Sequence, residues 1–232
     1  MVSSRTDSNA FIFGTIARVV LKENKIKATI TYPSPNPLIF HGSVMTNQGS
    51  STVRLMHYDP KWRQEFSQTK SSLLSACEGW LSEVEHIGGT AIPGMISQPT
   101  IDLLAGVKSS REIDQAACRI EGLNFLSADL DISSQKAMIL TKPRRLLEDQ
   151  NEATHRVFLT QIGSVLWRTS LAVRDYLRRS PEAALQYEEV KMLHWRRTEG
   201  DRVQYEASKS SYLTHLIDQI HVERSEDSAG TD

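Results

Sequence analysis

The sequence EHIGGTAIPG at residues 85–94, followed by TIDLL at residues 100–104, decides the fold. The apolar residues on either side of the glycines predict two strands joined by a short connection. Gly88, Gly89 and Thr90, here called the glycine turn, follow the first strand directly. Glycines let a backbone approach a ligand closely, and successive N–H groups can hold an anion. This stretch therefore predicts two neighbouring strands and a turn suited to phosphate.

The surrounding residues predict an α/β (α+β) fold, with a small mixed β-sheet, flanking helices and a helical C-terminal region. Apolar runs indicate strands, and apolar residues at helical spacing indicate helices. Pro60, Ser164, Pro181 and Asp201 are of types that commonly begin helices, as first-turn prolines or capping side chains. Strands are predicted over residues 53–57, 83–87, 100–107, 136–141 and 155–162 and near residue 125, and a helix over residues 109–120.

The two ends of the chain differ from this domain. Prolines within residues 33–37 stop a weak strand pattern, so residues 1–52 are predicted to form an N-terminal arm. That arm is either a decoration of the fold, a disordered leader or a segment upstream of a true start at Met45. Residues 221–232 are charged and small, which predicts a disordered tail. The folded domain is expected to span residues 53–220.

The composition narrows the functional classes. The 232 residues carry a net charge of −1, which gives no global attraction to nucleic acid, although a local basic patch would leave tRNA open as a partner. The two cysteines lack metal-ligand spacing and indicate reduced thiols. No apolar run approaches the roughly 18 residues of a membrane span, and no secretory signal begins the chain. We therefore expect a cytoplasmic protein with no membrane partner.

One carboxylate near the glycine turn predicts phosphate chemistry. Asp102 interrupts an apolar strand next to the turn, where it could hold Mg²⁺ against phosphates. The Thr90 hydroxyl could add one hydrogen bond. Nucleotidyl and phosphoryl transfer need this combination of positioning and charge neutralisation. The residues alone also fit an ordinary turn with a structural aspartate.

The same stretch resembles the signature of the GrpB family, whose usual form is E-H-I-G-S-T-A-V-P-G, then K-P-x-I-D-I. HYDPKW at residues 57–62 resembles the family's P-Y-D-P-x-W, and VRDYLR at residues 173–178 resembles F-R-D-Y-L-R. Thr154-His155 falls where the family has T-H-H-x-H. A similar domain extends some bacterial dephospho-CoA kinases. The resemblance implies a nucleotidyltransferase-like fold and, by analogy only, transfer chemistry.

The candidate site combines the residue-level reading with this resemblance. Asp102, Glu85 and His155 are the candidate catalytic residues, and Asp102 and Glu85 the candidate Mg²⁺ ligands. Glu85 has an alternative role as an ion-pair partner of Arg174. Lys209 falls on an apolar helical stripe and is expected to send its ammonium into a cleft between the two halves. The candidate ligand-binding residues are Gly88, Gly89, Thr90, Lys209 and Arg174.

The chain departs from the family pattern at several positions. Gly89 replaces a serine and Gln98 a lysine, and Thr100 stands where an Asp-x-Asp pair would begin. Arg156 and Phe158 replace two histidines; Arg156 could contact a phosphate, but exposure to solvent is the expected role. A two-metal mechanism wants two close carboxylates, so these departures favour a binding role.

Three functions remain open from the sequence. The first is a nucleotidyl- or phosphoryl-transferase that acts on a nucleotide or phosphorylated small molecule with Mg²⁺. The second is a non-catalytic module that binds a nucleotide, a CoA-like ligand or a protein. The third is an acyl- or aminoacyl-type transferase in a specialised pathway, with His155 as base.

Overall fold

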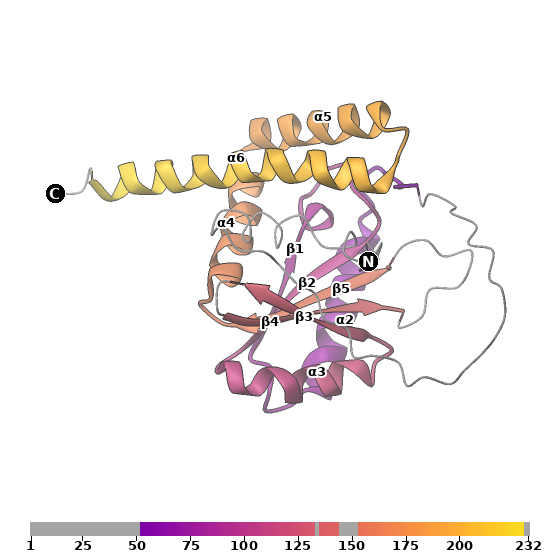
Figure 1. The fold of residues 1–232 in the computed structure, drawn as a ribbon, viewed down its shortest axis with the longest axis vertical. Coiled ribbons are helices and arrows are strands. Elements are labelled where there is room, and N and C mark those ends of the chain that lie inside the picture. The colour runs from indigo at the N-terminus through magenta and orange to yellow at the C-terminus, as the bar shows by residue number, and fades with distance from the viewer. Residues whose placement is uncertain (1–51, 133–134, 144–152, 230–232) are drawn as a thin grey trace, which may run out of the picture.

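The computed structural model describes residues 52–132, 135–143 and 153–229 (Figure 1). Apart from Thr52, the predicted arm over residues 1–52 lies outside the described residues. Thr52 forms an isolated bridge with Asp201. None of the helices in these ranges is both long and apolar enough to cross a membrane.

A five-stranded mixed sheet forms the centre of the fold, in the order β1-β2-β5-β4-β3. The parallel pair is β2 with β5, and the other neighbours are antiparallel. This confirms the predicted mixed sheet, and β1 has the predicted bounds. The strands are β1 (Glu83–Ile87), β2 (Ile101–Val107), β3 (Leu126–Ile132), β4 (Gln135–Lys142) and β5 (His155–Gln161).

Helices cover the sheet and extend beyond it. In Figure 1, α5 and α6 run side by side at the end of the molecule opposite α3, and α4 connects them to the sheet. The C-terminal region is therefore helical, as predicted. The helices are α2 (Lys61–Ala76), α3 (Ile113–Glu121), α4 (Val165–Arg179), α5 (Pro181–Arg197) and α6 (Arg202–Ala229).

The helix starts follow the capping residues of the sequence. Ser164 Oγ accepts a hydrogen bond from Trp167 N at 3.1 Å, and α5 begins with Pro181. Asp201 Oδ1 accepts from Gln204 N at 2.9 Å at the start of α6. At its other end, α6 continues to Ala229, so the structure is helical where the sequence predicts a tail.

Strand alternation divides the sheet between two cores. Ile101 and Leu103 pack towards α2 and α3, on what we call the α2 face. Leu104 and Phe158 pack against Leu166 of α4, on the α4 face. A third core fills the space between α4, α5 and α6. The α4 face is therefore enclosed by the C-terminal helices.

The strand predicted over residues 53–57 is absent from the sheet. Met56 forms only an isolated bridge with Ser97. Val53 is buried, but its N–H donates to Gly200 O at 2.7 Å rather than to a strand. This prediction is wrong because the apolar Val53 packs beneath the α5–α6 connection and does not extend the sheet.

Candidate ligand-binding site

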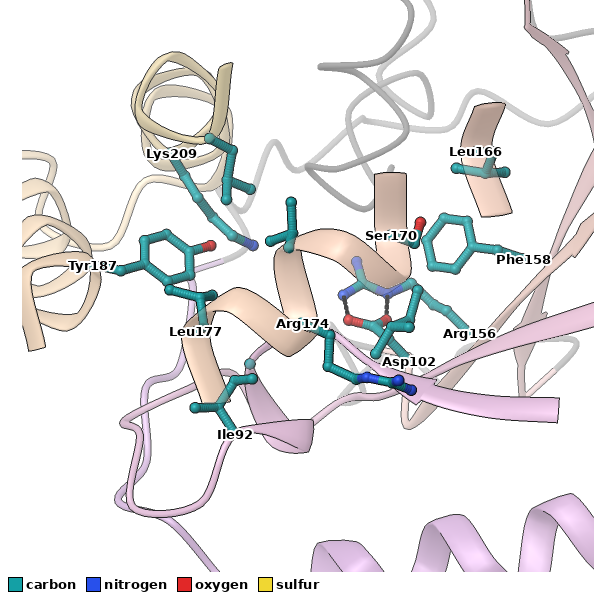
Figure 2. A pocket seen from close by; sticks show the side chains of 15 residues that line it. Ile92, Asp102, Arg156, Phe158, Leu166, Ser170, Arg174, Leu177, Tyr187 and Lys209 are labelled. Atoms are coloured by element: carbon teal, nitrogen blue, oxygen red, sulfur yellow. Dashed lines mark hydrogen bonds and ion pairs between the residues drawn. The ribbon is translucent and has the colours of Figure 1, made fainter. Parts of the chain in front are cut away.

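A pocket on the α4 face lies between the glycine turn and helices α4 to α6 (Figure 2). We call it the α4 pocket. Most of its wall is apolar, as in many small-molecule sites. Its free volume is about 50 Å³, room for a few water molecules, so a larger ligand requires side chains at its wall to move. The polar lining comes from Gly88, Gly89, Asp102, Arg156, Ser170, Arg174, Tyr187 and Lys209.

Neighbouring side chains leave no room for a Cβ atom at either glycine of the turn. Gly88 has a φ of 74°, and a Cβ there would collide with the Asp102 carboxylate. A Cβ on Gly89 would collide with the hydroxyl of Ser97. Ser97 therefore occupies the space above Gly89, where the family pattern has a serine. The turn is pressed directly against Asp102.

Asp102 is bound on both oxygens by Arg156. Arg156 Nε lies 2.6 Å from Asp102 Oδ1, and Nη2 lies 3.1 Å from Oδ2. The two residues are register partners on β2 and β5, which places their side chains on the same face. Their side chains are only 13% and 9% exposed. Arg156 is thus a buried partner of Asp102, and the expectation that it is exposed is wrong.

Glu85 takes the alternative role anticipated from the sequence. Arg174 Nη1 donates to Glu85 Oε2 at 2.5 Å, and Arg174 Nε donates to Asp175 Oδ1 at 2.7 Å. Burial alone would lower the pKa of Arg174, but these hydrogen bonds and charges outweigh it and raise the pKa. Arg174 is held as a charged wall of the α4 pocket.

These residues do not fit the predicted Mg²⁺ site. Both oxygens of Asp102 already accept from a guanidinium, and Glu85 is paired with Arg174. Within the described ranges there is no group of three or more His, Cys, Asp or Glu side chains that could hold a metal ion. Magnesium prefers oxygen ligands free of competing cations, so we assign no metal-dependent step to this arrangement.

Lys209 lies in the α4 pocket, at the position expected from its helical stripe. Its Nζ is 3.7 Å from Glu206 Oε2, and Figure 2 shows it next to Tyr187. The buried Lys191 lies nearby and donates to Ile96 O and Ser97 Oγ. Burial and then the charge of Lys209 lower the pKa of Lys191 to about 7. Lys209 is the cation of this pair that reaches the α4 pocket.

His155 does not lie with Asp102. It is one residue before Arg156, so strand alternation places it on the α2 face. There it lines a separate recess with Glu65 and Lys142. Burial and then Lys142 lower its pKa to about 4. The prediction that His155 acts beside Asp102 is not supported by this placement.

Thr90 also points away from the α4 pocket. Its hydroxyl donates to Thr100 O at 3.2 Å and lies 3.1 Å from His86 Nε2. His86 stacks on Phe66 of α2, with ring centroids 4.5 Å apart. The Thr90 hydroxyl therefore ties the turn to the α2 face, and only the two glycines face the α4 pocket.

Ser170 is a site residue that sequence reasoning missed. It is fully buried, lines the α4 pocket, and its Oγ has no hydrogen-bond partner, the only such buried side-chain atom among the described residues. A buried hydroxyl without a partner costs about 1–3 kcal/mol. The available signal was its position on the apolar stripe of α4, between Leu166 and Val173.

Known proteins support the fold and the family. The profile described as GrpB protein matches residues 52–219. A UPF0157 protein of Pseudomonas aeruginosa is 25% identical over 79% of this chain and 74% of its own length. The glutamate-rich protein GrpB of Alkalihalophilus pseudofirmus is 21% identical over 76% of this chain and its full length.

One solved structure supports the fold. The crystal structure of conserved protein GrpB from Enterococcus faecalis covers 74% of this chain and 99% of its own, with 22% identity and a TM-score of 0.62. The Cid1 poly(U) polymerase bound to MgATP covers 60% of this chain and 43% of its own, with 13% identity and a TM-score of 0.43. The match to the family profile spans most of the folded region, and this chain belongs to the GrpB family.

Proposed function

We propose that the chain binds a nucleotide or another phosphorylated small molecule in the α4 pocket. The observation that carries the proposal is the unpartnered Ser170 hydroxyl inside a pocket lined by cations and the glycine turn. A ligand oxygen or nitrogen would supply the missing hydrogen bond. In the free protein the buried Ser170 hydroxyl costs free energy because it has no hydrogen-bond partner, and ligand binding would remove that cost.

The charges of the pocket favour an anionic ligand. Arg156 and Arg174 are neutralised by neighbouring carboxylates, whereas the Lys209 ammonium lies 3.7 Å from Glu206 Oε2 and 6.0 Å from the centre of the Tyr205 ring. Lys209 therefore has donors available for a phosphate, beside the backbone of the glycine turn. The apolar wall from Phe158, Leu166 and Leu213 would hold the organic part of the ligand.

Transfer of a nucleotidyl or phosphoryl group at the same place is the second candidate. It is favoured by the contact between the Asp102 carboxylate and the glycine turn, which would bring an acidic group next to a bound phosphate. A non-catalytic binding module uses the same pocket without turnover. Product formation, measured separately from binding, distinguishes the two.

A thermal-shift screen tests the binding proposal. Ligands are the four nucleoside triphosphates, CoA and dephospho-CoA, each with and without Mg²⁺. A ligand at about 100 times its Kd should stabilise by about 2.7 kcal/mol and raise Tm by several degrees. Lys209→Gln should abolish the shift, and Lys108→Gln, which removes an exposed lysine outside the pocket, should retain it. A shift that survives Lys209→Gln would contradict the placement.

A further inference from the structure

A second recess lies on the other side of the glycine turn. It has a free volume of about 420 Å³, against about 50 Å³ for the α4 pocket, and is within the range of small-molecule sites. Arg63 and Phe66 come from α2, and Arg178 comes from α4. His86 and Thr90 complete the wall towards the turn. We call this recess the arginine groove.

Two cations face the arginine groove without a carboxylate among its lining residues. Arg178 Nε donates to Ala91 O at 3.1 Å, which fixes the guanidinium at the edge of the turn. Within the described part of the chain, neither Arg63 nor Arg178 forms an ion pair. Burial and then the charge of Arg174 lower the pKa of Arg178, and Arg63 adds a smaller effect in the same direction.

The acidic groups that act on Arg178 are hydrogen-bonded to another arginine. Glu85 and Asp175 favour the charged form of Arg178 through space, but both are hydrogen-bonded to Arg174. His86 adds no charge at pH 7, because burial and then Arg178 lower its pKa to about 4. Arg63, Arg174 and Arg178 together carry three positive charges against the two negative charges of Glu85 and Asp175, so this cluster keeps a net charge of +1 at the groove.

We propose that the arginine groove is a second anion-binding site, which takes a phosphate or carboxylate group of a small molecule between Arg63 and Arg178. Guanidinium groups bind both kinds of oxyanion through paired N–H donors. Arg174 lines the α4 pocket and Arg178 lines the arginine groove, so α4 contributes one cation to each of the two cavities beside the glycine turn. The site goes beyond the α4 pocket and does not depend on a ligand there.

Calorimetric titration of the full chain with pyrophosphate, and separately with malonate, tests this site at constant ionic strength. Arg63→Gln/Arg178→Gln should weaken binding of the preferred anion by at least about tenfold. The matched control is Lys61→Gln/Arg179→Gln, which removes one exposed cation from each of the same two helices outside the groove. If the double variant fails to fold, Arg63→Gln alone replaces it in the titration, because this substitution changes an exposed side chain.

The outcomes separate the two sites. Binding that is lost in the groove variant but kept in the control and in Lys209→Gln supports the proposal, and the better of the two anions identifies its chemistry. Equal weakening by groove and control variants would show a general charge effect and overturn it. Loss in Lys209→Gln alone would assign the anion to the α4 pocket and overturn it as well, as would absence of binding of both anions to the wild type.

Discussion

The two faces of the sheet are formed by alternating residues of the same strands, but they bury different kinds of polar side chain. On the α2 face, the apolar Leu103 is accompanied by His86 and His155, whose pKa values are both lowered to about 4. On the α4 face, Asp102 and Arg156 are buried as ions. An apolar interior accepts histidine in its neutral form, whereas the α4 face accepts charges because each carboxylate meets a guanidinium.

This difference points to function on the α4 face. Replacing a buried ion pair by apolar residues is often neutral or stabilising, so the Asp102–Arg156 pair is weak support for a purely structural role. The α4 face also has the glycine turn and the unpartnered Ser170. The α2 face, by contrast, contains the largest continuous apolar core, which packs α2 and α3 against the sheet.

The largest effect should come from breaking the ion pair. Asp102→Ala would leave Arg156 buried without its partner and should lower the free energy of unfolding by about 3–5 kcal/mol. Asp102→Leu/Arg156→Met removes both charges and should cost much less. Urea unfolding of both variants checks this, and an equal loss in the two would contradict the idea that charge compensation is the reason.

The next largest loss of stability should come from disturbing the contact between Gly88 and Asp102. Gly88→Ala adds a Cβ at a positive φ and against the carboxylate, and should cost about 2–4 kcal/mol. Gly79 has a similar φ of +82° with open space around it, so Gly79→Ala gives the cost of a positive φ without a clash, about 1–2 kcal/mol. The ψ of −173° at Gly88 adds to the backbone cost there. Equal unfolding free energies of the two variants would mean that the turn does not press on Asp102.

The neutral histidines of the α2 face predict that the stability of the folded chain depends on pH. The pKa of His86 is about 4 in the folded chain against an ordinary value of 6.5, so the unfolded chain binds more protons between these values. Stability is full above pH 6.5 and falls as the pH drops towards 4, by about 1–2 kcal/mol at pH 5 from His86. Urea unfolding at pH 7 and pH 5 should show a smaller loss in His86→Gln than in the wild type, and an unchanged loss would refute this assignment.

The smallest effect concerns the α4 pocket itself. Ser170→Ala removes a hydroxyl without a partner and should raise the free energy of unfolding by up to about 1 kcal/mol. Ser164→Ala on the same helix removes a cap and should lower it by about 1 kcal/mol. If Ser170→Ala is as destabilising as Ser164→Ala, then the Ser170 hydroxyl is bonded in the free protein.

The sequence was informative where one local pattern settles the structure. The apolar strands around the glycine turn predicted the arrangement of β1 and β2, because glycines and a lone Asp102 leave few alternatives. Lys209 was expected to send its ammonium into a cleft between the two halves, because a lysine on an apolar stripe must direct its charge to a polar region, and the structure has it in the lining of the α4 pocket.

The sequence could not settle which face each residue of β5 takes. HRVFLTQ is apolar on both sides in its centre, so alternation does not tell whether His155 or Arg156 faces Asp102. Register with β2 decides it, and that is a tertiary property. The position of Arg178 in the arginine groove could not be predicted either, because the groove forms only where residues of α2 and α4 come together beside the turn.

The most direct test of the ligand site compares one residue from each face. The ligand that gives the largest thermal shift with the wild type is titrated into Lys209→Gln and His155→Gln. The α4 pocket predicts that Lys209→Gln loses binding while His155→Gln keeps the wild-type Kd. Loss of binding in His155→Gln with retention in Lys209→Gln would place the ligand on the α2 face and contradict the central claim.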